Sequence, residues 1–181
     1  MAAWVLVLFG CGDSTDATDP VLSAGDYPAG PFGTGAGDTV GNLDFLQSNG
    51  ERLTFGSIHA DVDKDVMVVV TGAGWCTSCR ELHQKMQTLH EGDPGLFIAL
   101  ALYQDEQFQT PGAELAAFWA ERYALSYAVL ADDRGHMQTH FDPLSTSQVM
   151  VIDTADMTLA GLLPYWEDDA VAGLVDAVRE N

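Results

Sequence analysis

Trp75-Cys76-Thr77-Ser78-Cys79-Arg80 follows the apolar run Val66-Met67-Val68-Val69-Val70 and precedes an amphipathic segment that begins at Glu81. This order predicts a buried strand, a short loop and a helix that carries two thiols in its first turn. At a helix start, free backbone N–H groups and the positive end of the helix dipole stabilise a thiolate, the form of cysteine that attacks disulfides. We therefore interpret Cys76 and Cys79 as a pair that performs thiol–disulfide exchange.

Half of a zinc site and a static disulfide are the other interpretations of this spacing. A four-thiolate zinc site needs a second cysteine pair, but the chain has three cysteines and the third, Cys11, lies near the N-terminus. Zinc is therefore disfavoured. A static disulfide stays open, although Cys-x-x-Cys after a strand in a βα pattern is typical of redox sites.

Length and composition predict one domain with a short appendage, since the chain has 181 residues and 47% of them are hydrophobic. Its 27 acidic and 7 basic side chains give a formal net charge of -20 at pH 7. Such a charge repels nucleic acid phosphates and anionic lipid headgroups. We therefore expect no nucleic-acid partner.

The first eleven residues form an apolar run that ends in Gly10-Cys11, and a polar string follows over residues 12–20. This arrangement resembles a bacterial lipoprotein signal, in which the residues before Cys11 are removed and its thiol is lipidated. The resemblance implies a lipid-anchored protein that faces the periplasm and touches the membrane only through the lipid on Cys11. An apolar terminus with an incidental cysteine is the alternative, whereas a spanning helix is excluded because it needs about 20 apolar residues.

The remaining pattern predicts a hairpin followed by alternating helices and strands. Leu43-Asp44-Phe45-Leu46 and Arg52-Leu53-Thr54-Phe55 flank Ser48-Asn49-Gly50, and Asn-Gly is a strong hairpin signal. Beyond the hairpin we expect helices over residues 76–90, 110–123, 135–141 and 167–179, and strands over residues 96–103, 127–130, 148–153 and 159–163. Such alternation indicates a sheet with helices packed across it.

The motif and the order of elements resemble the thioredoxin superfamily, in particular its TlpA-like and AhpC/TSA-type redoxin branch. The resemblance covers about residues 38–181 and rests on three segments: Val68-Val69-Val70-Thr71-Gly72-Ala73-Gly74-Trp75-Cys76-Thr77-Ser78-Cys79, Ala128-Val129-Leu130-Ala131-Asp132 and Val151-Ile152-Asp153. It implies an α/β fold, a three-layer α/β/α sandwich with an N-terminal β-hairpin and an inserted strand–helix. In front of this domain we expect the signal over residues 1–11 and a flexible tether and irregular segment over residues 12–37.

The resemblance also implies roles for site residues. Cys76 corresponds to the exposed nucleophile that forms a mixed disulfide with a client, and Cys79 to the thiol that resolves it. Trp75 corresponds to the lip on which the client docks. Thr146 and Ser147 stand where the family places a substrate-docking cis-proline; because no proline is present, we expect a trans peptide there. The implied partners are client proteins with disulfides or dithiols and an electron-donor protein, with no dissociable cofactor.

A peroxidase of the peroxiredoxin type is the alternative enzyme on the same fold. Its motif is Pro-x-x-x-Thr/Ser-x-x-Cys. The proline and hydroxyl places hold Val69 and Ala73 when the frame is set on Cys76, and Gly72 and Cys76 when it is set on Cys79. Neither frame fits, so only the shared fold supports this alternative.

A metal- or peptide-binding protein that kept the fold is the non-enzymatic alternative. His83 lies four residues after Cys79 and seven after Cys76, and thiolates with an imidazole can bind copper or zinc. A single helical histidine is more often a packing or surface residue, so we assign no metal site. The other histidines have no partner readable from the sequence, and a solvated position is expected for each: His59, His90, His136 and His140.

Overall fold

A computed structural model describes residues 27–141 and 146–180 of the chain. The predicted signal, the predicted lipidation site at Cys11 and the tether up to residue 26 lie outside these ranges. Within them, no helix is both long enough and apolar enough to cross a bilayer.

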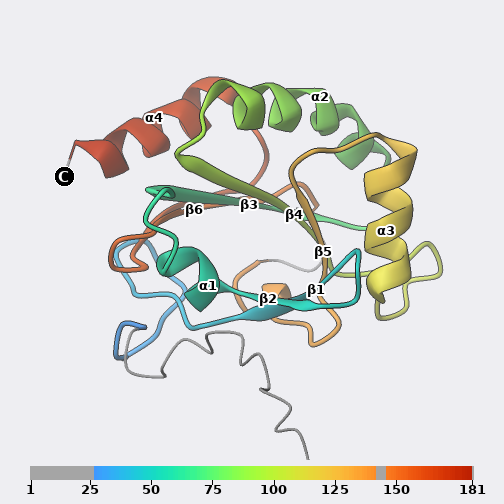
Figure 1. Ribbon diagram of the computed structural model, residues 1–181, viewed down its shortest axis with the longest axis horizontal. Coiled ribbons are helices and arrows are strands. Elements are labelled where there is room, and N and C mark those ends of the chain that lie inside the picture. The colour runs from blue at the N-terminus through green and yellow to red at the C-terminus, as the bar shows by residue number, and fades with distance from the viewer. Residues whose placement is uncertain (1–26, 142–145, 181) are drawn as a thin grey trace, which may run out of the picture.

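A seven-stranded sheet forms the middle layer, with the strand order β2-β1-β5-β4-β3-β6-β7 (Figure 1). The strand β3 lies in the interior of the sheet, parallel to β4 and antiparallel to β6. The strands are β1 (Asp44–Gln47), β2 (Arg52–Thr54), β3 (Val66–Gly72), β4 (Leu96–Leu102), β5 (Ala128–Ala131), β6 (Val149–Asp153) and β7 (Leu159–Leu163).

Helices cover both faces of the sheet. The helices α2 (Thr77–Gly92) and α4 (Asp168–Arg179) lie on one face, and α1 (Phe55–His59) lies on the other (Figure 1). The helix α3 (Ala113–Arg122) packs against β5 and β1, and the 3-10 turn η1 (Met137–Thr139) follows β5. This arrangement confirms the α/β/α sandwich predicted from the sequence.

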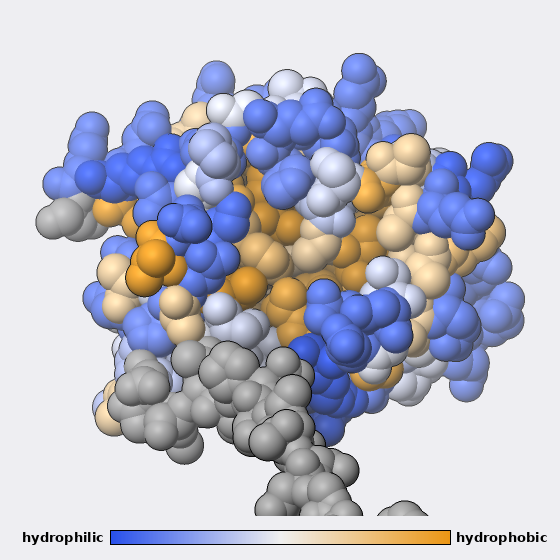
Figure 2. Space-filling model, in the orientation of Figure 1, coloured by the Kyte–Doolittle hydropathy of each residue, from blue (hydrophilic) through white to orange (hydrophobic). Residues whose placement is uncertain are grey.

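Two hydrophobic clusters hold the layers together, and the side-chain alternation of β3 divides that strand between them. Val66, Val68 and Val70 belong to the cluster with the helices α2, α3 and α4. Met67 and Val69 belong to the cluster with α1 and η1. All five side chains are fully buried, which explains why this strand is a continuous apolar run. Figure 2 shows hydrophobic residues gathered in the middle of the viewed face, with hydrophilic residues above and below.

The predicted N-terminal hairpin is present, and its strands pair with Phe45 opposite Leu53. Gly50 adopts φ +84°, the left-handed conformation that its turn requires. The expectation that Phe55 belongs to the second strand is wrong, because Phe55 begins α1. The hydroxyl of Thr54 caps that helix by accepting a hydrogen bond from the Ser57 N–H (3.0 Å). A five-residue helix is too short to show a helical period in the sequence.

The segment in front of the hairpin lies along the edge strand β7. The Gly37 N–H donates to the Leu159 carbonyl (2.8 Å), and the Leu159 N–H donates to the Asp38 carbonyl (2.9 Å). Tyr27 donates its hydroxyl hydrogen to the Val40 carbonyl (2.8 Å). Backbone groups of β7 that would face solvent are thereby partly paired.

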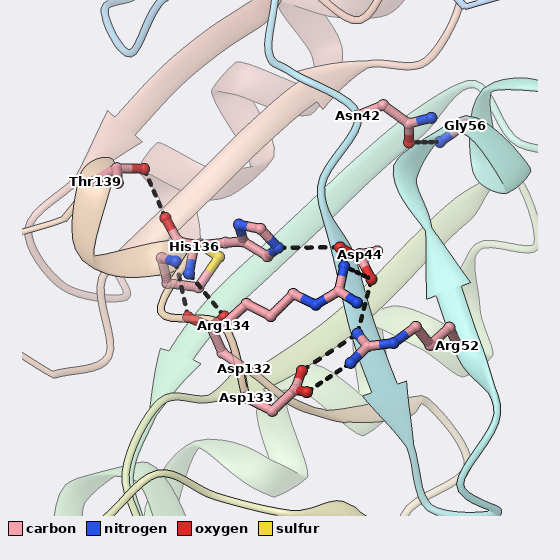
Figure 3. A network of polar contacts seen from close by, with 10 residues as sticks. Asn42, Asp44, Arg52, Gly56, Asp132, Asp133, Arg134, His136 and Thr139 are labelled. Carbon is pink, nitrogen blue, oxygen red and sulfur yellow. Dashed lines mark hydrogen bonds and ion pairs between the residues drawn. The ribbon is translucent and has the colours of Figure 1, made fainter. Parts of the chain in front are cut away.

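A network of charged groups joins the hairpin to the loop after β5 (Figure 3). The Asp44 carboxylate contacts Arg52 (2.7 Å), Arg134 (2.7 Å) and His136 Nε2 (3.1 Å), and Arg52 also pairs with Asp133. Partial burial by itself would raise the pKa of Asp44, but hydrogen bonds from His136 and Arg134 and the arginine charges lower it overall. The expectation of a solvated position for His136 is met only in part, because its side chain is 27% exposed and contacts Asp44, a residue distant in the chain.

Candidate redox site

The end of β3 and the start of α2 position the two cysteines. Cys76 is the N-cap of α2, and its Sγ accepts a hydrogen bond from the Cys79 N–H (3.1 Å). The Cys76 N–H in turn donates to the Ala73 carbonyl (2.9 Å), which closes the turn between the strand and the helix. The two sulfurs form a disulfide that spans the first turn of the helix. The strand–loop–helix context predicted for the motif is confirmed.

Both sulfurs are covered, with 2% of Cys76 and 1% of Cys79 exposed. The expectation of an exposed Cys76 is therefore wrong for the oxidised state. As the N-cap, Cys76 turns its sulfur back toward the first N–H groups of α2, and it joins the hydrophobic cluster that contains Val70 and Ala73. Burial in that cluster removes most water from around the disulfide.

Three hydroxyl groups surround the disulfide. The Cys76 Sγ lies 3.4 Å from Ser78 Oγ and 3.3 Å from Thr146 Oγ1. The Cys79 Sγ lies 3.4 Å from Ser147 Oγ. Because disulfide sulfurs carry no hydrogen, the hydroxyls are the donors in this state. The structure thus brings Thr146 and Ser147 beside the cysteines.

The backbone at Ser147 has an unusual conformation. Its φ is +66°, in the left-handed region that residues other than glycine rarely occupy. Its N–H donates to the Thr71 carbonyl at the end of β3 (3.0 Å), and the Gln148 N–H donates to the Thr71 hydroxyl (3.1 Å). Among the described residues the one cis peptide is Gly30-Pro31, so Thr146-Ser147 is trans, as expected without a proline.

Trp75 lies next to the disulfide in an aromatic group. Its ring stacks on Phe108 (5.4 Å between centroids, 27° between planes) and meets Tyr103 edge-on (6.5 Å). The Trp75 Nε1–H donates to Gln104 Oε1 (3.1 Å), so the loop after β4 holds the indole. Phe108 is 62% exposed, with φ +62°. Sequence reasoning missed Phe108 and Gln104, because a polar loop after a strand carries no signal for contact with Trp75.

Gly74 explains how closely this loop approaches the motif. The Gly74 N–H donates to the Gln104 carbonyl (2.8 Å). A Cβ at this position would lie 2.6 Å from the Glu106 nitrogen, so only glycine fits between the two loops. The glycine thereby sets the distance between the redox motif and the loop that carries Phe108.

His83 is part of the packing between α2 and α3. Its Nδ1 is 2.8 Å from the Tyr127 hydroxyl, and its ring contacts Tyr123 (4.5 Å) and Trp119 (5.2 Å). Burial, together with the charge of Arg80, lowers the pKa of His83 to about 4. Within residues 27–141 and 146–180, no three histidine, cysteine or acidic side chains are placed to hold a metal ion.

Known structures share this architecture. No protein-family model and no curated protein matches the chain. A peroxidoxin, BcpB, from Mycobacterium tuberculosis aligns with a TM-score of 0.63 and 16% identity over 82% of this chain and 98% of its own. A thiol:disulfide interchange protein, DsbE, from Chlorobium tepidum aligns with a TM-score of 0.61 and 13% identity over 81% of this chain and 99% of its own. The exposed lipoprotein thioredoxin of Streptococcus pneumoniae aligns with a TM-score of 0.58 and 16% identity over 78% of this chain and 100% of its own.

At these identities the likenesses establish the fold. The chain has a thioredoxin-like fold, as the resemblance of its sequence to the thioredoxin superfamily predicted. In this fold it carries a disulfide-bonded Cys-x-x-Cys pair at the N-terminus of α2.

Proposed function

We propose that the protein is a thiol–disulfide oxidoreductase that exchanges electrons with protein partners through Cys76 and Cys79. The observation that carries the proposal is the disulfide between these residues at the N-terminus of α2. When the pair is reduced, the hydrogen bond from the Cys79 N–H and the nearby Thr146 hydroxyl stabilise a thiolate on Cys76. The same groups therefore suit Cys76 for nucleophilic attack.

The proposed exchange has two steps. The Cys76 thiolate attacks a client disulfide, a mixed disulfide forms, and the first client sulfur leaves as a thiolate that takes up a proton. Cys79 then loses its proton and attacks the Cys76 sulfur, which releases the second client sulfur and closes the disulfide. Two electrons pass to the client, and a donor protein restores the two thiols. With a dithiol client the steps run in reverse.

We propose that clients dock against the Trp75 and Phe108 rings. The two rings are stacked, and Phe108 presents most of its surface to solvent beside the motif. An exposed aromatic pair next to a reactive group suits binding of an apolar client segment. Since Cys76 is covered, docking must also shift the side chains around its sulfur before the client can reach it.

A location outside the cytoplasm completes the proposal. An oxidising compartment preserves disulfides, and the apolar run that ends at Cys11 resembles a lipoprotein signal. The exposed lipoprotein thioredoxin among the structural neighbours is consistent with such a location. Membrane fractionation of cells that express wild type and Cys11→Ser tests the anchor, because only wild type should sediment with membranes.

Insulin reduction tests the activity. Wild type, Cys76→Ser and Cys79→Ser are compared before and after metal removal. Wild type should reduce insulin, Cys76→Ser should be inactive, and Cys79→Ser should accumulate a mixed disulfide visible on a non-reducing gel. Equal inactivity of wild type and Cys76→Ser, together with copper binding, would establish the binding-protein alternative instead.

A peroxidase is the second candidate, because one structural neighbour is a peroxidoxin. The same variants, assayed with hydrogen peroxide and a thiol reductant, separate the two activities. Consumption of peroxide that depends on Cys76 and exceeds insulin reduction would favour the peroxidase.

A further inference from the structure

We infer that the Ser147 hydroxyl stabilises negative charge on the resolving sulfur, Cys79, and thereby controls how readily the disulfide opens. The inference rests on the proposed exchange at Cys76 and Cys79. It concerns the sulfur that leaves when the disulfide is attacked, whereas the helix N-terminus and Thr146 act on the other sulfur.

Direct contact supports this role. Ser147 Oγ lies 3.4 Å from Cys79 Sγ, and the serine is 6% exposed. Little water can therefore solvate a charge on Cys79, and a hydrogen bond to a charged group strengthens when water is excluded. In the part of the chain that the structure describes, Ser147 is the one side chain other than Cys76 found within hydrogen-bonding distance of this sulfur.

Of the groups around Cys79 that the structure describes, none substitutes for this hydroxyl. On β3, Val70 is apolar, and the Thr71 hydroxyl donates to the Gln148 carbonyl (3.5 Å) while it accepts a hydrogen bond from the Gln148 N–H (3.1 Å). On α2, Arg80 Nη2 donates to the Gly74 carbonyl (3.3 Å), and His83 Nδ1 pairs with the Tyr127 hydroxyl. Neither of these α2 side chains has a hydrogen bond to Cys79. Among residues 27–141 and 146–180, the resolving sulfur thus has one neutral hydroxyl donor and no hydrogen bond to an acidic or basic side chain.

The backbone holds the hydroxyl in place. The left-handed φ of Ser147 is unfavourable for serine and persists because the N–H groups of Ser147 and Gln148 both bind Thr71. This conformation directs the side chain toward Cys79 Sγ. Strain of this kind is concentrated where a side chain must occupy a particular position at a functional site.

The chemical consequence concerns the opening step. When a donor thiolate attacks Cys76, a new bond forms between the donor sulfur and Cys76, and the bond to Cys79 breaks. The electron pair remains on Cys79, which carries the charge until it takes up a proton. A hydroxyl that stabilises this thiolate makes Cys79 a better leaving group and the disulfide more oxidising.

Substitutions at Ser147 separate the hydroxyl from the backbone effect. Ser147→Gly removes the hydroxyl and tolerates the left-handed conformation, and Ser147→Asn keeps a polar donor in a residue that also tolerates it. Ser78→Ala is the matched control, since it removes a hydroxyl beside Cys76 only. The first readout is the pH dependence of Cys79 alkylation in a Cys76→Ser background, followed by mass spectrometry at Cys79. The second is the rate at which dithiothreitol opens the disulfide.

We expect Ser147→Gly to raise the pKa of the Cys79 thiol and to slow opening about tenfold, the effect of one hydrogen bond to a charged group. Ser147→Asn should recover part of both effects, and Ser78→Ala should leave the Cys79 titration unchanged. Unchanged titration and opening in Ser147→Gly would overturn the inference. Should Ser147→Gly fail to fold, Cys79 alkylation and disulfide opening are measured on Ser147→Ala, which also lacks the hydroxyl, and the same outcomes test the inference. Cys79 titration is read without any client, so failure of the inference is distinguishable from failure of the exchange activity.

Discussion

The Thr146 hydroxyl lies 3.3 Å from the Cys76 sulfur, although the two residues are 70 positions apart in the chain. The antiparallel pairing of β6 with β3 brings them together, because Val149 lies opposite Val70 in that register. The residues before β6 therefore meet the loop that follows β3. A hydroxyl from one segment thus reaches the proposed nucleophile on the other.

Replacing Thr146 by valine should make the thiolate form of Cys76 less stable. The shape is kept while the hydroxyl is lost, so the pKa of the Cys76 thiol should rise and alkylation near neutral pH should slow about three- to tenfold. The pH profile of alkylation at Cys76 measures this effect. Thr139→Val is the control, since its hydroxyl bonds the His136 carbonyl away from the sulfurs. Identical profiles in all three proteins would show that Thr146 does not act on Cys76.

Replacing Gly74 by alanine should disturb the contact between the motif and the loop after β4. The new Cβ would lie 2.6 Å from the Glu106 nitrogen, and a backbone atom cannot move aside as a flexible side chain can. We expect a loss of about 1–3 kcal/mol in the free energy of unfolding, together with slower insulin reduction. Urea denaturation measures the stability change.

Gly92→Ala is the matched control for that substitution. Apart from its chain neighbours and the backbone of its own helix, no described atom lies within 4 Å of a Cβ at Gly92, the last residue of α2. Alanine there should leave insulin reduction unchanged and stabilise the protein by up to about 1 kcal/mol. A Gly74→Ala protein as stable as Gly92→Ala would contradict the close approach of the two loops.

His83 should make stability depend on pH below neutrality. The pKa of His83 in the folded protein is lowered from 6.5 to about 4. Between these pH values the histidine is protonated in the unfolded chain and largely neutral in the folded protein. Its contribution is complete above about pH 6.5 and declines by up to about 1.4 kcal/mol per pH unit as the pH falls toward 4. Urea denaturation of wild type and His83→Phe across this range isolates the effect. The stability of wild type relative to the variant should fall with decreasing pH; parallel curves would refute the explanation.

Asp44→Asn should loosen the attachment of the hairpin to the loop after β5. The carboxylate contacts two arginines and His136, so its loss should cost about 1 kcal/mol at low salt and less at high salt. Because the pKa of Asp44 is lowered from 3.8, this contribution is present above that pH and disappears as the pH falls through the folded value. Wild type and variant should then converge in urea denaturation at low pH. Asp176→Asn, at an exposed position on α4, should show neither effect.

Predictions made from neighbouring residues succeeded for most of the fold. The apolar run of β3, the Asn-Gly turn and the periodicity of α2 each depend on a few adjacent residues, and the structure has each element near its expected position. The short helix α1 was not predicted, and the 3-10 turn η1 was predicted as a longer helix over residues 135–141. Elements of three to five residues show too little of a helical pattern in the sequence.

The site was predictable only in part. The spacing of the two cysteines indicated a pair that can close a disulfide across one helical turn, and the structure contains that disulfide. The burial of Cys76 was not predicted, because it depends on the hydrophobic cluster that α2 completes with the sheet. Nor was the stacking of Phe108 on Trp75, since these residues lie on different loops.

By itself, the sequence determined the chemistry of this protein: two thiols placed where a helix begins, after a strand apolar enough to be buried on both faces. Helix capping, turn formation and side-chain periodicity act between near neighbours and can be read along the chain. Only the tertiary structure decided the surroundings of the sulfurs, the Thr146 and Ser147 hydroxyls beside them and the Phe108 ring over Trp75. The physical reason is that the order of strands in a sheet, which sets those neighbours, arises from contacts between segments far apart in the chain.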